Sequence, residues 1–184
     1  ECCGKFLHLV FNINTNNNSL IFQIDFANRK RIPHHDTHLS VDYTDVPIEQ
    51  KGHTFASQKL KGKSELRYEI AVTILTGEIA WINGPFQAGE YSDLRIFREG
   101  RLQHAIDLGE RVEADDGYRG DPTNFRVSYE VLTRQNEEAD NMQKRVQGRH
   151  ETINARLKKF AILRERYRHD ITQHGYVFRA VAVL

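Results

Sequence analysis

Three acidic residues in this 184-residue chain stand where a protein could use them to bind a hard divalent cation. Asp42 lies within the strand-like segment LSVDYTDVPI, Asp115 follows the short apolar run 112–114, and Glu151 opens the segment ETINARLKKF. Carboxylate oxygens are the ligands that Mg²⁺ and Mn²⁺ prefer. Two such ions about 3.5–4 Å apart can activate a water molecule and stabilise the leaving oxygen of a phosphodiester. Three carboxylates drawn from 25 acidic residues can also be ordinary surface groups, so spacing alone leaves both interpretations open.

The surroundings of two of these residues favour a role beyond solubility. Asp42 stands in a segment otherwise suited to burial, where a charge is costly unless it is paired or bound to a metal. At 100° per residue, Ile153, Leu157 and Phe160 form the apolar stripe of a helix, and Glu151 lies off that stripe. We therefore expect Glu151 on a helix flank that can face a cleft.

Two further aspartates have simple structural explanations. Asp116 directly follows Asp115 and precedes Gly-Tyr, a setting in which Asp commonly bonds to the backbone of a turn. Asp93 follows Ser92, a favourable N-cap residue, so its charge suits the first turn of a helix. The double aspartate leaves the second metal ligand open by one position.

The elements that must position these residues follow from periodicity and turn residues. The pattern predicts a strand at 39–48, a hairpin of 66–75 and 78–86 around Thr76-Gly77, a helix between Ser92 and Gly109, a strand at 111–114, a loop at 119–136 and a long helix at about 137–168. This order is typical of a single α/β domain with a mixed sheet, over residues 39–184. Residues 1–38 form a poorly specified N-terminal segment.

Composition limits the classes of protein that need to be considered. No run of about 18 apolar residues is present, so no membrane span is expected, and the N-terminal residues lack the features of a signal peptide. Cys2 and Cys3 are adjacent and are the only cysteines, which favours a reducing compartment. The chain lacks an initiating Met and ends inside an apolar run, so we expect a fragment of a longer chain.

Basic residues are concentrated in the predicted C-terminal helix, which suits contact with a phosphate backbone but also describes a solvated helix face. Within 144–169 only Glu151 and Glu165 oppose the basic residues Lys144, Arg145, Arg149, Arg156, Lys158, Lys159, Arg164, Arg166 and Arg168. The loop after the first strand adds Lys59, Lys61 and Lys63, which could touch phosphate or simply be exposed.

Two short polar motifs near residue 34 carry weaker signals. His34, His35, Asp36 and His38 could bind a transition metal, but their spacing fits no standard motif and a polar loop is the simpler interpretation. The tripeptide 29–31, Arg-Lys-Arg, could belong to a nuclear-import signal, although three residues are weak support.

Four motifs in order carry a family resemblance. They are SVDYTDVPI, LRYEIAVTILTGEIAWINGPFQAGEYSDLRIF, VEADDGYRG and RHETINARLKKF. Together they resemble the DDE-type nuclease domain of Harbinger-like transposases, in the RNase H-like superfamily, over residues 39–184. The resemblance implies an RNase H-like mixed sheet flanked by helices. It also implies that Asp42, Asp115 and Glu151 are the catalytic residues and the ligands of two Mg²⁺ or Mn²⁺ ions, with Asp116 a turn residue or a hydrogen-bond acceptor beside them.

The function implied by this resemblance is a metal-dependent DNA endonuclease or strand transferase that acts in the nucleus. Its expected partners are DNA and a separate Myb-like DNA-binding protein, and assembly into an oligomer stays open. The basic residues expected to hold the DNA backbone are Arg149, Arg156, Lys158, Lys159 and Lys63.

The chain departs from the family pattern in two respects. Tyr43 stands where the family commonly has Gly after the first Asp, and nothing before residue 39 resembles a helix-turn-helix. Two alternatives therefore remain beside the nuclease: a domesticated, catalytically inactive DNA-binding module with the same fold, and an enzyme of this fold that acts on RNA. The presence of all three carboxylates favours activity.

Overall fold

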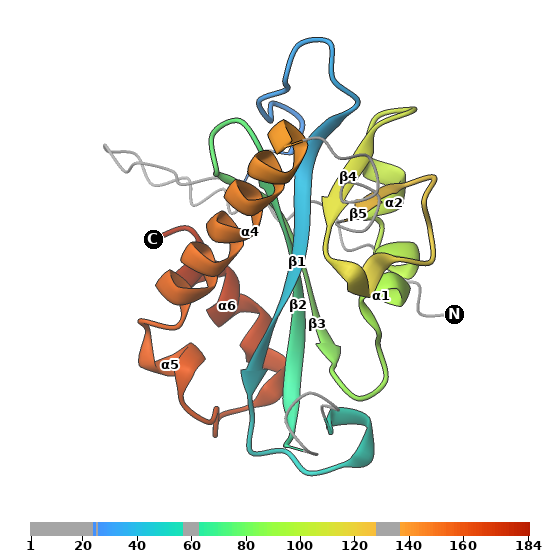
Figure 1. Ribbon diagram of the computed structural model, residues 1–184. Helices are drawn as coiled ribbons and strands as arrows, with labels where there is room; N and C mark the ends of the chain where they lie inside the picture. The colour runs from blue at the N-terminus through green and yellow to red at the C-terminus, as the bar shows by residue number, and fades with distance from the viewer. Residues whose placement is uncertain (1–23, 25, 57–62, 128–136) are drawn as a thin grey trace.

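A five-stranded mixed sheet forms the centre of the computed structural model, which describes residues 24, 26–56, 63–127 and 137–184 (Figure 1). The strand order is β3-β2-β1-β4-β5; β1, β2 and β3 pair antiparallel, whereas β4 and β5 run parallel to β1. The strands are β1 (Thr37–Pro47), β2 (Glu65–Thr73), β3 (Ile79–Gln87), β4 (Arg111–Ala114) and β5 (Phe125–Val127). The α/β mixed sheet flanked by helices is thus confirmed, in an arrangement consistent with an RNase H-like fold.

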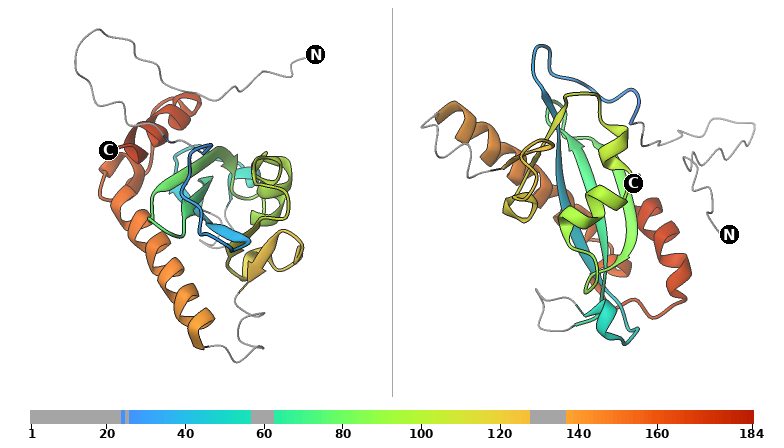
Figure 2. Two further views of the ribbon diagram at one scale, coloured as in Figure 1. Left: turned by 90° about the horizontal axis from the view of Figure 1, so that it is seen from above. Right: turned by 90° about the vertical axis from the view of Figure 1, so that its right-hand side faces the viewer.

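Helices cover both faces of this sheet, as the two rotated views make clear (Figure 2). The helices α4, α5 and α6 pack on one face, and α1 and α2 pack on the other. The helices are α1 (Asp93–Glu99), α2 (Leu102–Ala105), α4 (Glu137–Leu157), α5 (Ala161–Arg164) and α6 (His174–Ala182), with short 3-10 turns at His53–Phe55, Asp116–Tyr118 and Ile171–Gln173. No helix in the described part of the chain combines the length and apolarity that a membrane crossing requires.

The two faces of β1 alternate residue by residue, as the pleat of a strand requires. Leu39 and Val41 pack into the core beneath α1 and α2, whereas Val46 and Ile48 pack on the α4 side. Ser40 also faces α4, where it contacts a helix residue. Asp42, two residues further along, therefore shares the α4 side of the central strand.

The helix predicted between Ser92 and Gly109 is two helices, so this prediction is wrong in its length. Ser92 caps α1 as expected, accepting a hydrogen bond from the backbone of Arg95 at 3.4 Å. The first helix ends at Gly100, whose carbonyl accepts a hydrogen bond from Asn83 Nδ2 at 2.7 Å. Arg101 then adopts a left-handed φ of 78°. Gly109 consequently lies in the turn before β4 and does not end a helix.

The predictions for the C-terminal third were wrong in two further places and left one helix out. The loop expected at 119–136 contains β5. The expected helix 137–168 is instead α4, which ends at Leu157, followed by the short α5 and then by extended chain from Glu165. Tyr167 there donates its N–H to the carbonyl of Pro47 and accepts from the N–H of Glu49, both at 2.9 Å. This bridge to the end of β1 overrides the helical pattern. Residues 174–182, which form α6, carried no prediction.

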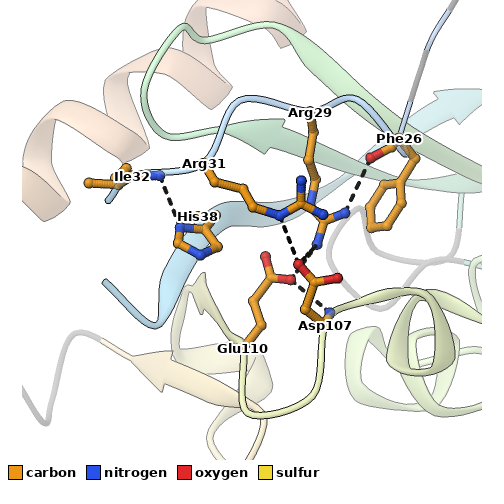
Figure 3. Close-up of polar contacts among 7 residues, drawn as sticks. All are labelled: Phe26, Arg29, Arg31, Ile32, His38, Asp107 and Glu110. Carbon is orange, nitrogen blue, oxygen red and sulfur yellow. Dashed lines mark hydrogen bonds and ion pairs between the residues drawn. The ribbon is translucent and has the colours of Figure 1, made fainter. Parts of the chain in front are cut away.

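The segment before β1 is tied to the domain by ion pairs (Figure 3). Arg29, only 6% exposed, bonds to Glu110 and Asp107 in the loop between α2 and β4, and Arg31 reaches the same Asp107 at 2.8 Å. Arg29 is therefore buried and does not present a basic surface signal.

The histidines of 34–38 are not gathered into a metal site among the described residues. His38 instead accepts a hydrogen bond through Nδ1 from the backbone of Ile32 at 3.1 Å (Figure 3). The polar connector predicted for this segment thus extends only to Asp36, because Thr37 and His38 are buried residues at the start of β1.

Candidate functional site

A cavity of about 190 Å³ lies between β1, the end of β4 and α4. Its walls include Asp42 from β1, Asp115 from the residue after β4 and Glu151 from α4. Strand tips beside a helix are where α/β folds commonly present ligand-binding groups. The structure therefore brings together the three carboxylates that the sequence singles out.

Asp42 is held in place by its own backbone neighbour. Its Oδ1 accepts the N–H of Tyr43 at 2.7 Å. Because successive side chains of a strand point to opposite faces, Tyr43 turns away from the cavity. The Tyr43 ring lies 4.1 Å from the Arg67 guanidinium, a cation–π contact. The bulky residue at the position where the family has Gly thus does not crowd Asp42.

Asp115 opens the tight turn that follows β4. Its Oδ1 accepts the N–H of Gly117 at 2.9 Å, an Asx-type turn, and its side chain is exposed. Tyr118 anchors the turn in the core, because its ring is fully buried and packs against the Phe125 ring at a centroid distance of 4.7 Å. The side chain of Asp116, the alternative ligand, lies outside the described side chains.

Glu151 is exposed on the flank of α4, as the helical pattern predicts. The stripe that buries α4 against the sheet comprises Val146, His150, Ile153 and Leu157. Phe160 does not belong to this stripe and is 40% exposed, because α4 ends before it.

An ion-pair bridge beside Asp115 was missed from the sequence. Arg67 on β2 donates to both carboxylate oxygens of Asp45, at 2.8 and 2.9 Å, and to Asp93 Oδ1 at 2.9 Å. Burial raises the pKa of Asp93 to about 7; Arg67 opposes this shift, and repulsion from Asp115, Asp45 and Asp42 adds to it. Asp93 does occupy the first turn of α1, and it also adjoins Asp115 at Gly117.

Three buried polar residues, Ser40, His150 and Glu113, line the cavity, and all three were missed. His150 Nε2 lies 2.8 Å from Ser40 Oγ, and burial lowers the pKa of His150 to about 4. Glu113, on β4, is also buried at the cavity, and desolvation raises its pKa while Arg126 and Arg111 oppose the shift. Residues that become buried only when distant segments meet have no local sequence signature.

The residues around the cavity fit a hard divalent cation by their chemistry. Asp42, Asp115 and Glu151 offer oxygen donors only, which is the set that Mg²⁺ and Mn²⁺ prefer. The mutual repulsion that contributes to the raised pKa of Asp93 shows negative charge that a cation would neutralise. Within the described residues, no three such side chains are already gathered as metal ligands.

Basic side chains extend from this cavity along α4. Arg156, Lys158 and Lys159 are exposed. Arg149 is half-buried and lies against the β2–β3 hairpin, where its Cδ is 3.5 Å from the position that a β-carbon on Gly77 would take.

Position along the helix decides which basic residues stand beside the carboxylates. Lys144 lies about two turns before Glu151 on the same side of α4, and Lys158 is the first residue after this helix ends at Leu157. Lys63 is exposed directly before β2, beside the far end of β1, and does not line the cavity.

Searches of protein families, curated proteins and solved structures find no significant match to this chain. The cavity, its charges and the sequence motifs are therefore what bear on function.

Proposed function

We propose that this chain is the nuclease domain of a transposase, a metal-dependent DNA endonuclease or strand transferase. One observation carries the proposal. Asp42, Asp115 and Glu151 come from a central strand, a neighbouring strand end and a covering helix, and all three line one cavity. The resemblance of the four sequence motifs to Harbinger-like transposases supports the same assignment of these residues.

Asp42, Asp115 and Glu151 would hold Mg²⁺ or Mn²⁺ ions in this cavity. Bound ions would activate a water or hydroxyl nucleophile and neutralise charge on the leaving oxygen. The chain itself supplies the negative charge that attracts the cations and the turn that presents Asp115. The same carboxylates repel a phosphodiester in the absence of a cation, since like charges at close range are unfavourable. DNA is thus expected to approach the cavity productively only together with the metal.

Basic residues at the C-terminal end of α4 would hold the DNA backbone beside the cavity. Arg156 lies in the last turn of α4, and Lys158 and Lys159 follow in the exposed turn after it. Each neutralised phosphate releases counterions, so this binding weakens as salt rises and does not depend on base sequence.

The decisive experiment is cleavage of DNA by the purified chain with Mg²⁺ or Mn²⁺, and its abolition by EDTA. Asp115→Asn keeps the shape of the side chain but removes an anionic ligand, so it should eliminate cleavage while DNA binding stays normal or tightens. Asp116→Asn is the matched control at the adjacent position and should retain activity. Equal cleavage by Asp115→Asn and the wild type would contradict the assignment of Asp115.

Other outcomes of this assay decide between the remaining alternatives. Binding without cleavage, on DNA that carries the proper element ends, would support the inactive DNA-binding module. Preferential cleavage of RNA would support an RNA-directed enzyme of the same fold. The proposal also implies a nuclear location and a Myb-like partner, which tagging in cells and co-purification would test.

A further inference from the structure

A buried hydrogen bond joins the central strand to α4 at the wall of the cavity. Ser40 Oγ and His150 Nε2 are 2.8 Å apart, and the two residues are 3% and 5% exposed. We propose that this pair, the Ser40–His150 pin, sets the rotation and axial position of α4 on the sheet and so determines where Glu151 stands relative to Asp42. Ser40 and His150 are then positioning residues for the site, an inference that rests on the proposed function.

The strand side of the pin is rigid and adjoins the first carboxylate. Ser40 pairs with Val72 on β2 and with Glu113 on β4, so its backbone is fixed from both sides. Because Ser40 and Asp42 are two residues apart on one strand, they face the same side of the sheet. A side chain that bonds to Ser40 is therefore placed at a fixed position relative to Asp42.

The helix side of the pin adjoins the third carboxylate. His150 directly precedes Glu151, and one residue of an α-helix corresponds to about 1.5 Å of rise and 100° of rotation. A slip or roll of α4 that moves the His150 ring away from Ser40 must therefore displace Glu151 by a similar amount. The pin thus couples the two elements at the residues nearest to the site.

The remaining buried contacts of α4 cannot specify its register as sharply. Val146, Ile153 and Leu157 are apolar, and hydrophobic burial is non-directional. A hydrogen bond has strict distance and angle requirements, and a single polar residue in an otherwise apolar seam is a known way to fix register. A shifted helix would leave both Ser40 and His150 buried without partners, which disfavours that arrangement.

A distance measurement tests the pin without reference to catalysis. The full chain carries Cys2→Ser and Cys3→Ser. Spin labels are attached to cysteines that replace Ala155 on α4 and Leu108, an exposed residue of the α2–β4 loop. Pulsed electron paramagnetic resonance then gives the distribution of the label distance. Ser40→Ala and His150→Leu should shift or broaden this distribution.

Two control variants separate register from general loosening. His150→Gln can place an amide near the position of the imidazole Nε2, so it should restore the wild-type distribution. Ile153→Val removes buried apolar volume from the same stripe without touching the pin, and should leave the distribution narrow. Unchanged distributions in both Ser40→Ala and His150→Leu, or equal broadening in Ile153→Val, would overturn the proposal.

Mn²⁺ binding, followed by loss of the free-ion resonance signal, tests the consequence for the site. Loss of groups that orient metal ligands typically weakens metal affinity by about 10–100-fold, and we expect at least the lower figure for Ser40→Ala and His150→Leu. His150→Gln and Ile153→Val should bind nearly as the wild type does. Wild-type affinity in both pin variants would refute the positioning role. If the wild type itself shows no saturable Mn²⁺ site, the proposed function fails, and the distance measurement alone decides whether the pin sets the register.

Discussion

The carboxylates of Asp93 and Asp115 meet at the backbone of Gly117, although one comes from the start of a helix and the other from the end of a strand. A β-carbon on Gly117 would lie 2.6 Å from Asp93 Oδ2 and 3.0 Å from Asp115 Oδ1. Such distances are shorter than carbon and oxygen atoms tolerate, so only a hydrogen fits between the two carboxylates. This packing explains why glycine follows the paired aspartates in VEADDGYRG.

Gly117→Ala should therefore disturb the site. Asp93 cannot retreat easily because Arg67 holds its other oxygen at 2.9 Å, so we expect Asp115 or the turn to move. Metal-dependent cleavage should fall by at least about tenfold, in line with a misplacement of roughly 1 Å. Gly148→Ala is the control, since nothing lies within 4 Å of a β-carbon there, and it should raise the free energy of unfolding by about 0.5–1 kcal/mol. Full activity in Gly117→Ala would show that the packing is not needed.

Breaking the ion-pair bridge at Arg67 should destabilise the fold strongly. The side chains of Arg67, Asp45 and Asp93 are 9%, 10% and 12% exposed. Arg67→Met therefore leaves two nearly buried carboxylates without their cationic partner. Removing one partner of a buried ion pair typically costs about 3–5 kcal/mol. Urea unfolding measures the loss, and adding Asp45→Asn and Asp93→Asn should restore part of it.

The control for this effect is a surface arginine. Arg95→Met breaks the pair with Glu99, whose side chain is 51% exposed, and should cost far less stability than Arg67→Met. Equal losses from the two arginine variants would contradict the burial argument.

Acid should destabilise the protein partly through His174. His174 is fully buried with Nδ1 2.6 Å from Tyr68 Oη, and burial lowers its pKa to about 4. The unfolded imidazole, with a pKa of about 6.5, takes up a proton that the folded state excludes. This contribution, up to about 3 kcal/mol, is complete above pH 6.5 and is lost as pH falls toward 4. His174→Asn keeps a partner for Tyr68, so its free energy of unfolding should depend less on pH in this window; an unchanged slope would argue against the shift.

A rise in pH from about 4.5 to 8 should act through Glu69 with the opposite sign. Glu69 is fully buried, its Oε2 accepts from Trp81 Nε1 at 3.2 Å, and burial raises its pKa to about 8. The folded state keeps a proton that the unfolded state releases, so this contribution is present below about pH 4.5 and is lost as pH rises toward 8. Glu69→Gln should therefore lose less stability than the wild type between these values. Glu99→Gln, at an exposed carboxyl, should follow the wild-type profile.

The proposed DNA contacts of α4 predict a change in salt dependence. Substituting Arg156, Lys158 and Lys159 together by Ala should weaken binding alike for all DNA sequences. It should also reduce the slope of log affinity against log salt by about 3, roughly one for each lost phosphate contact. Arg31→Ala, a basic residue paired with Asp107 before β1, is the control. An unchanged slope in the triple variant would show that this end of α4 is only a solvated face.

The sequence predicts strands of this fold better than helix ends. The segment 39–48 and the hairpin around Thr76-Gly77 carry alternating and β-branched residues, and both appear close to their expected bounds as β1 and β2–β3. β5 has three residues, too few for a periodic signal, and it exists because it pairs with β4. The helix expected to reach residue 168 stops at Leu157, and residue 167 is extended because Tyr167 pairs with the end of β1.

In the candidate site, too, the residues that local sequence patterns indicate could be predicted, and the contacts between distant segments could not. Asp42, Asp115 and Glu151 could be chosen from residue type, element and motif resemblance, and the structure places them on one cavity. The Arg67 bridge and the Ser40–His150 pin could not be predicted from the sequence, because each joins segments that are far apart in it. Neither member of such a pair looks unusual until the fold brings its partner within bonding distance.

The strand order also has a consequence for synthesis of the protein. β1, β2 and β3 are consecutive and antiparallel, so they can pair as soon as they leave the ribosome. β4 joins the opposite edge of β1 only after α1 and α2, and Glu151 arrives later still on α4. Non-local pairings of this kind form slowly, because a long stretch of chain must be ordered before the contacts compensate for it. The three carboxylates therefore meet only after α4 has been made, and a nascent chain that ends before residue 151 cannot assemble the site that we propose cuts DNA.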